Sequence, residues 1–288
     1  IYEQIDHNDG TIHGRTLTRG YFSWEKGEKD SKVIWTPDPR GRFLTSWIPP
    51  KQYRNSQRLV KGNKFPGNDQ LGMFGCDSYD ISGTVDGRGS NGALHGLTKT
   101  NMHEDVPSNL FFLQYVARPK TAEIFFEDVL MAIVFYGMPI LAENNKPRLL
   151  YHLKNRGYRG YSMNRPDKHI SKLSKTEKEL GGIPNTSEDV KQVHADSIAT
   201  YIEEYVGYDK EGTYRDPEDC GDMLFNETLQ DWAKFDISNR TKFDASISSG
   251  LAIMGTRKHK LTPDRKRSEI KFNFVTYNNS GNRSEISE

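Results

Sequence analysis

The sequence predicts an α/β fold in which helices flank a central, mixed β-sheet. Three short apolar segments follow one another, and each has the length and composition of a strand. The hydrophobic period then changes from two to 3.6, which predicts a helix, and another strand and another helix follow directly. Because a strand, a crossover helix and a second strand normally form a parallel pair, we expect both strands in one sheet.

Length, cysteine content and hydropathy narrow the class of protein. The chain has 288 residues, which is enough for the core of an enzyme. Two cysteines, Cys76 and Cys220, lack the paired spacing of a zinc site, and a reducing cytoplasm suits them. No apolar stretch approaches the roughly 18 residues of a membrane span, and no signal peptide follows Ile1. We therefore expect a soluble fragment or processed product that binds no membrane.

Residues 1–68 are predicted to be an N-terminal arm or linker with short strands. Residues 32–35 and 43–47 are strand-like, and four prolines, Pro37, Pro39, Pro49 and Pro50, break any longer element. The folded domain is expected at residues 69–260. A basic and polar tail is expected at residues 261–288.

The three core strands come first in this domain. Residues 71–76 form an apolar run that Asp77 closes, as in a buried strand. A polar, glycine-containing turn at residues 86–91 leads to a second strand at residues 93–100, which suggests a hairpin. Residues 110–116 are aromatic and predict the third strand.

The crossover helix and the fourth strand follow. Thr121 is placed as the helix N-cap, and Gly137 with Pro139 ends the helix. Residues 138–142 predict a strand that Glu143 closes.

Four further helices complete the domain. The first is capped by Asn144 or Asn145, has Pro147 in its first turn and ends at Gly157. The others are predicted at residues 197–206, 223–234 and 243–254.

Three acidic residues point to a metal site. If the strand ending at Glu143 lies beside the strand ending at Asp77, about 4.8 Å away, the two carboxylates converge at one edge of the sheet. Such a pair repels itself unless a cation intervenes, and magnesium or manganese prefers oxygen ligands. Asp244 opens a helix rich in small residues that allow close packing, so it can add a third carboxylate. Three carboxylates holding two ions about 4 Å apart suit phosphodiester cleavage.

Three motifs carry a resemblance to a known family. They are residues 71–80 (LGMFGCDSYD), residues 139–145 (PILAENN) and residues 242–252 (KFDASISSGLA). In this order they resemble the acidic motifs of the C-terminal nuclease domain of tailed-phage large terminase subunits, in the RNase H-like, RuvC-like superfamily. The resemblance implies a sheet of five or more strands in the order 3-2-1-4-5. It also implies an endonuclease with two magnesium or manganese ions, in which Asp77, Glu143 and Asp244 match the catalytic metal ligands.

The same resemblance implies a biological setting. The family cuts concatemeric double-stranded DNA during phage genome packaging, at the procapsid portal in the cytoplasm of the bacterial host. Its partners are DNA, an upstream ATPase domain of the same protein, the portal and the small terminase. No Gly-x-x-x-x-Gly-Lys-Ser/Thr phosphate loop occurs here, so we expect this chain to cut DNA without pumping it.

The formal net charge of +1 conceals segregated charge. Residues 154–178 and 257–271 are basic, and residues 203–236 are acidic. The first basic stretch follows the helix behind Glu143, so four of its residues are candidates for phosphate binding: Arg156, Arg159, Arg165 and Lys168. A solvated loop is the alternative interpretation.

Simpler interpretations stay open for the acidic residues. Asp77 suits a turn after a strand, and Asp244 suits a helix N-cap. Asp80 is a fallback ligand, and Asp236 is a rival for the third position. The histidines lack the spacing of metal ligands, so none is assigned a catalytic role.

Two other functions remain as alternatives. One is a Holliday-junction resolvase or a transposase-like nuclease of the same fold. The other is a non-catalytic module that binds DNA or the portal, in which acidic residues balance the basic stretches.

Overall fold

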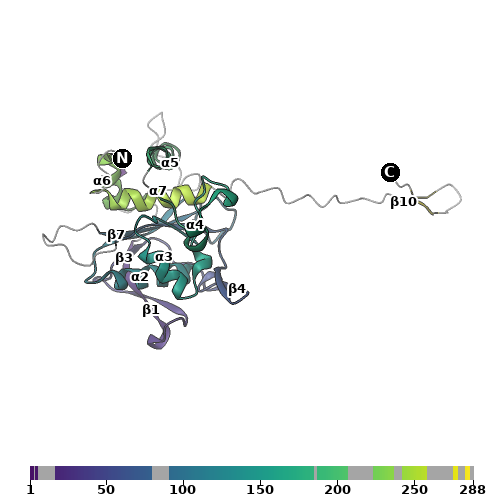
Figure 1. Ribbon diagram of the computed structural model, residues 1–288, viewed down its shortest axis with the longest axis horizontal. Coiled ribbons are helices and arrows are strands. Elements are labelled where there is room, and N and C mark those ends of the chain that lie inside the picture. The colour runs from purple at the N-terminus through teal and green to yellow at the C-terminus, as the bar shows by residue number, and fades with distance from the viewer. Residues whose placement is uncertain are drawn as a thin grey trace.

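A seven-stranded mixed sheet with helices on both faces forms the centre of the protein (Figure 1). The computed structural model describes residues 1–2, 4–5, 17–79, 91–184, 187–206, 223–236, 242–257, 275–277 and 283–285. The strand order is β2-β1-β3-β8-β7-β6-β9. In Figure 1, α5, α6 and α7 lie above the sheet, and α2 and α3 lie below it. The predicted α/β class, with a mixed sheet larger than five strands, is confirmed.

The middle of the sheet has the predicted order. The first three core strands, β6 (Gly72–Asp77), β7 (Gly92–Thr98) and β8 (Phe111–Ala117), are antiparallel neighbours. The fourth, β9 (Ile140–Ala142), pairs in parallel with β6. The order β8-β7-β6-β9 thus reproduces 3-2-1-4. In the fifth position the structure has isolated parallel bridges, from Ile140 to Ser162 and from Glu143 to Ile183.

Three strands from residues 1–68 extend the same sheet beyond β8. They are β1 (Thr18–Trp24), β2 (Val33–Pro37) and β3 (Phe43–Thr45), all paired antiparallel. Phe43 lies opposite Tyr115 of β8, and the ring of Phe22 packs 4.8 Å from that of Phe43. Part of the segment expected to be an arm therefore belongs to the main sheet, because burial of these aromatic side chains stabilises its packing there. A separate hairpin joins β4 (Gln57–Val60) to β5 (Asn63–Pro66).

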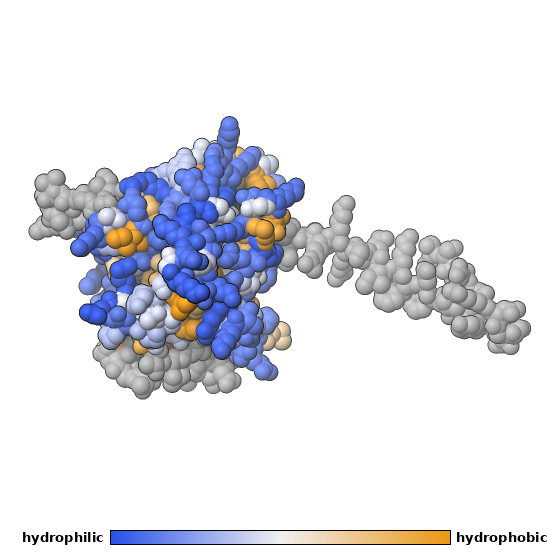
Figure 2. All heavy atoms as spheres, turned by 90° about the horizontal axis from the view of Figure 1, so that it is seen from below, coloured by the Kyte–Doolittle hydropathy of each residue, from blue (hydrophilic) through white to orange (hydrophobic). Residues whose placement is uncertain are grey.

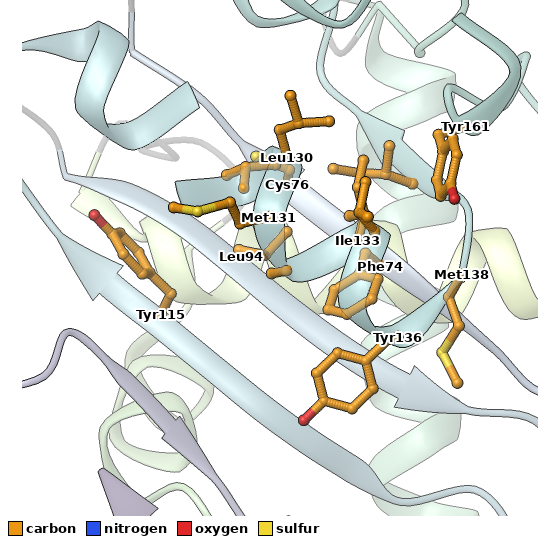
Figure 3. Packing of buried hydrophobic residues seen from close by; sticks show 14 of the residues in the cluster. Phe74, Cys76, Leu94, Tyr115, Leu130, Met131, Ile133, Tyr136, Met138 and Tyr161 are labelled. Carbon is orange, nitrogen blue, oxygen red and sulfur yellow. The ribbon is translucent and has the colours of Figure 1, made fainter. Parts of the chain in front are cut away.

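The crossover helix α2 (Ala122–Tyr136) covers one face of the sheet. Its predicted ends are confirmed: Thr121 accepts a hydrogen bond from the Ile124 N–H at 3.4 Å, and Gly137 has a left-handed φ of 63°. Figure 3 shows Leu130, Met131, Ile133 and Tyr136 gathered with Phe74, Cys76, Leu94 and Tyr115 of the sheet. Even-numbered residues of β6 therefore face α2.

The opposite face is covered by α7 (Asp244–Arg257), with α5 (Glu188–Tyr205) and α6 (Asn226–Lys234) packed against it. Gly75 permits a close approach, because a Cβ there would lie 2.1 Å from the Ser248 carbonyl oxygen. The prediction of a helix at residues 197–206 was nine residues too short at its start. Ser187 caps α5 by accepting from the Val190 N–H at 3.4 Å.

The predicted caps of α3 (Arg148–Asn155) are wrong. Pro147 precedes the helix, and no side chain caps it. Asn144 instead donates to the Gly181 carbonyl at 3.4 Å, and Asn145 donates to Glu143 Oε1 at 2.6 Å. Both side chains are drawn away by partners that lie outside the helix.

The remaining elements are short. They are α4 (Lys175–Leu180), the 3₁₀ turns η1 (Glu25–Gly27), η2 (Lys51–Tyr53), η3 (Arg159–Tyr161) and η4 (Ile170–Lys172), and the paired strands β10 (Val275–Tyr277) and β11 (Arg283–Glu285). In the described part of the chain, no helix has the length and hydropathy to span a membrane. On the face shown in Figure 2, hydrophilic side chains predominate and hydrophobic ones form small, separate patches.

Some predicted features fall outside the described residues. They are Asp80, Cys220, most of the turn at residues 86–91, part of the acidic stretch and nearly all of the second basic stretch.

Candidate active site

Asp77 lies at the carboxyl end of β6, on the face of the sheet that α7 covers. Successive side chains of a strand point to opposite faces. Phe74 and Cys76 point to the α2 side (Figure 3), so Gly75 and Asp77 point to the α7 side. The helix that begins with Asp244 thus covers the face from which Asp77 projects.

Glu143 reaches the same place from the neighbouring strand. Leu141 of β9 packs with Ile247 and Leu251 of α7, and Glu143 follows two residues later. The Glu143 N–H donates to the Cys76 carbonyl at 3.1 Å, which continues the parallel pairing beyond the end of β9. The expectation that both strands end side by side is met.

Asp77 and Glu143 are in contact. Their carboxyl groups lie within hydrogen-bonding range, and Asp77 is 7% exposed. Burial, together with repulsion from Glu143 and then Asp244, raises the pKa of Asp77 well above its ordinary value, and Lys146 opposes that rise. Placing the buried Asp77 carboxylate against the half-buried Glu143 carboxylate is unfavourable unless a proton or a cation lies between them.

Asp244 is the first residue of α7 and lies close enough for its charge to act on Asp77. Its Oδ2 accepts a hydrogen bond from the Asn91 N–H at 2.8 Å, at the start of β7. Burial raises the pKa of Asp244 to about 6, repulsion from Asp231 adds to the rise, and the Asn91 hydrogen bond opposes it. Asp244 is therefore a near neighbour of the contacting pair, held toward β7.

The donor set suits a hard divalent cation. All three side chains offer carboxylate oxygens, the ligands that magnesium and manganese prefer. Among the described residues, no group of three His, Cys, Asp or Glu side chains is already gathered closely enough to hold a metal ion.

Two basic residues near this site were missed in the sequence. Lys146 lowers the pKa of both Asp77 and Asp244, and Arg118 lowers that of Asp244. The Arg118 guanidinium lies 4.6 Å from the centre of the Tyr79 ring. Lys146 comes three residues after Glu143, so its position beside that motif was the available signal.

The arginines predicted to bind phosphate have partners within the protein. Arg156 donates to Glu127 at 2.6 Å and to Asp30 at 2.9 Å. Arg159 donates to three backbone carbonyls and to the side chain of Asn164. Arg165 is 5% exposed and pairs with Asp167 and Glu177, whereas Lys168 is exposed. These arginines join segments of this protein to one another, over as many as 126 positions of sequence for Arg156 and Asp30.

Asp236, the alternative to Asp244 as third ligand, and the buried histidines lie in different environments. Asp236 is exposed, while Asp231, which sequence reasoning did not select, lies near Asp244. His95 and His194 are completely buried next to α7, and their ring nitrogens contact its residues.

No protein-family model and no curated protein matches this sequence. Among solved structures, the chain is similar to the large terminase nuclease from thermophilic phage G20c, with 12% sequence identity and a TM-score of 0.43. The match covers 75% of this chain and 89% of the phage nuclease chain.

Proposed function

We propose that this protein is a magnesium- or manganese-dependent endonuclease that hydrolyses phosphodiester bonds of double-stranded DNA. The observation that supports it best is the contact between the buried Asp77 and the half-buried Glu143, with Asp244 as a near neighbour. Keeping these acids together lowers the stability of the metal-free protein, and a bound cation would offset that loss. Ionisable groups perturbed by such an arrangement cluster at functional sites.

The chain's own residues then have separable roles. Asp77, Glu143 and Asp244 would hold two divalent ions, which would supply activation of a water molecule and stabilisation of the leaving oxygen. Lys146 and Arg118 attract the phosphate toward the acidic edge of the sheet. Contacts of this kind position DNA without reading its bases, so we expect low sequence specificity.

The three acidic motifs extend the proposal to a biological role. Their resemblance to large terminase nucleases supports concatemer cutting during phage genome packaging, in the cytoplasm of a bacterial host. An ATPase domain of the same protein, the portal and the small terminase are then the expected partners.

Plasmid digestion tests the catalytic proposal. Wild-type protein is incubated with supercoiled DNA in magnesium, manganese or EDTA, beside Asp77→Ala and the exposed control Asp105→Ala. We expect linearised or degraded DNA with metal for wild type and for Asp105→Ala, and intact DNA for Asp77→Ala and for all samples in EDTA.

Two outcomes would favour the alternatives. Cleavage of four-way junctions in strong preference to linear duplex indicates a resolvase. A folded wild-type protein that retards DNA but never cleaves it, with either metal, indicates a non-catalytic module.

A further inference from the structure

A buried chain of hydrogen bonds joins the sheet to both helices above the candidate site. His95 of β7 is completely buried, and both ring nitrogens have partners. Nδ1 lies 2.7 Å from Ser248 Oγ on α7, and Nε2 lies 2.8 Å from Thr228 Oγ1 on α6. His95 is therefore the point at which three elements meet.

The direction of each hydrogen bond follows from Glu227, the carboxylate at one end of this series of hydrogen bonds. Gln114 donates its amide to Glu227 Oε2 at 2.8 Å, so its oxygen accepts from the Thr228 hydroxyl at 2.6 Å. Thr228 has then used its only proton, and His95 must donate to it from Nε2. His95 Nδ1 is left as an acceptor, and Ser248 donates to it. Burial lowers the pKa of His95 to about 3, which agrees with a neutral ring.

Ser248 ties this chain to the start of α7. It lies one turn after Asp244, and donation to His95 takes the hydroxyl proton of Ser248 that could otherwise go back to the Asp244 carbonyl oxygen, 3.0 Å away. The absence of a side chain at Gly75 lets the same turn rest on β6. The hydrogen bond from Ser248 to His95 thus fixes the rotation of the first turn about the helix axis.

The neighbouring helix α6 contacts the same turn of α7. Asp231 of α6 accepts from the Ser246 N–H at 2.7 Å and from its hydroxyl at 2.9 Å. Trp232 donates its indole N–H to Ser249 Oγ at 2.9 Å. Three residues of a single turn, Ser246, Ser248 and Ser249, thus make these contacts just beyond Asp244, and the His95 bond to Thr228 joins α6 to them.

We propose that His95 is a positioning residue that sets the rotation of α7 and thereby keeps the Asp244 carboxylate within reach of a divalent cation bound by Asp77 and Glu143. The inference rests on the proposed metal-dependent function. His95 itself touches neither substrate nor metal, and it acts through Ser248.

Paired substitutions separate the two sides of the ring. His95→Asn can place an amide oxygen near the position of Nδ1 and keep the bond to Ser248. His95→Gln can place its amide near Nε2, so it keeps Thr228 and loses Ser248. Ser248→Ala removes only the hydroxyl, and it keeps the proposal testable if a histidine variant does not fold.

Thr45→Val is the matched control. Thr45 is also buried and donates within the sheet, to the Phe112 carbonyl at 2.8 Å, but it lies on β3 and away from α7. The control therefore loses a comparable buried hydrogen bond without touching the helix that carries Asp244.

The experiment measures manganese affinity of the full chain by the electron paramagnetic resonance signal of the free ion, together with kcat and KM on plasmid DNA. For His95→Gln and Ser248→Ala we expect affinity or kcat to fall by about 10- to 100-fold, the usual effect of losing support behind a metal ligand. KM for DNA should stay unchanged. His95→Asn and Thr45→Val should keep the wild-type manganese affinity.

Each other result has a definite meaning. If wild type binds and uses manganese but Ser248→Ala and His95→Gln equal it, positioning by His95 is refuted and the nuclease proposal stands. If Thr45→Val loses manganese affinity or kcat to the same extent, the losses reflect lower overall stability, and positioning by His95 is again refuted. If wild type binds no manganese, both proposals fail.

Discussion

Asp77 and His95 are both buried and ionisable, and burial moves their pKa values in opposite directions. The pKa of Asp77 rises because burial and the neighbouring acids disfavour its charged form, whereas that of His95 falls because burial disfavours its protonated form. Asp77 is held in an unfavourable setting that a cation would relieve. His95 is held in a fully hydrogen-bonded setting that suits a structural support.

Asp77→Asn should stabilise the metal-free protein. The pKa of Asp77 is raised in the folded state, so its free-energy cost is absent below the ordinary value of 3.8 and grows as pH rises above it. At pH 7 we expect the substitution to increase the free energy of unfolding by about 0.5–2 kcal/mol, the usual range for relieving such a site. Chemical denaturation in EDTA measures this change.

Manganese should make wild type more stable than Asp77→Asn, which is the reverse of the order expected in EDTA. Wild type gains free energy of unfolding in proportion to RT ln(1 + [Mn]/Kd), while Asp77→Asn gains much less. The exposed Asp105→Asn variant should follow wild type in both conditions. A metal-free Asp77→Asn protein less stable than wild type would contradict the strained acidic pair.

His95 should make the protein sensitive to acid. Its folded pKa of about 3 lies below the ordinary value of 6.5, so its contribution to stability is complete above pH 6.5 and is lost as pH falls toward 3. Between pH 6.5 and pH 5 the loss is about 2 kcal/mol. Denaturation curves at these two pH values should differ by less in His95→Asn than in wild type. An exposed control, His103→Asn, should leave the difference unchanged, and equal slopes for all three proteins would argue against a neutral buried ring.

Lys146 should contribute to DNA affinity through its charge alone. Neutralising it in Lys146→Gln should weaken binding to all sequences and reduce the slope of log K against log salt by about 1. Fluorescence anisotropy with duplex DNA over a range of salt concentrations measures that slope. Lys168→Gln tests the exposed lysine predicted from the sequence in the same assay. A slope unchanged by Lys146→Gln would remove this residue from the DNA-binding surface.

At the scale of elements, the face of the sheet to which a side chain points decides which helix it contacts, and this holds for the acidic residues as well. Odd-numbered residues of β6 face α7, and Gly75 is the position where the helix touches the strand. The helix ends encoded by Thr121 and Gly137 were predicted from neighbours in sequence, because capping is local. The packing of α7 on β6 is not local, and only its small residues hinted at it.

Gly75→Ala should displace α7 and impair metal binding. Its Cβ would lie 2.1 Å from the Ser248 carbonyl oxygen and 2.2 Å from the Ala252 nitrogen, both rigid backbone atoms. Overpacking of this kind costs about 1–3 kcal/mol of stability. We expect manganese affinity and cleavage to fall as well.

Gly96→Ala is the control for Gly75→Ala. Its Cβ would meet the Phe112 ring at 2.4 Å, on the α2 side of the sheet. It should lose stability but keep its affinity for manganese. If both variants lose affinity alike, the position of α7 is not what matters.

At the scale of the whole molecule, the N-terminal segment completes the sheet. β3 pairs with β8, and Phe22 packs 5.1 Å from Phe135 of α2, so the crossover helix is covered from the N-terminal side as well. These partners are about a hundred residues apart in the sequence, so local patterns could not predict that they pack together.

Removal of residues 1–45 should prevent the rest of the chain from folding cooperatively. The truncation exposes the edge of β8 and the aromatic side chains that β1 and β3 cover. Circular dichroism and thermal unfolding measure the result. Leu59→Pro, in the separate β4–β5 hairpin where Leu59 is 73% exposed, should leave a cooperative transition. A truncated protein that unfolds in a single sharp transition would show that the segment is dispensable.

The sequence by itself determined the local features: which residues form the four core strands, where α2 begins and ends, and that Asp77 and Glu143 end strands. These follow from side-chain period and from capping, which act over a few residues. The roles of Asp77, Glu143 and Asp244 as metal ligands stay a prediction.

Only the tertiary structure decided which polar groups meet. It engages Arg156 with Glu127 and Asp30, brings Lys146 near the acids, and joins His95 to Ser248 across 153 positions of sequence. Buried polar groups must find partners, and the identity of each partner depends on how distant segments pack. That information is distributed over the whole fold and is not present in any short stretch of the chain.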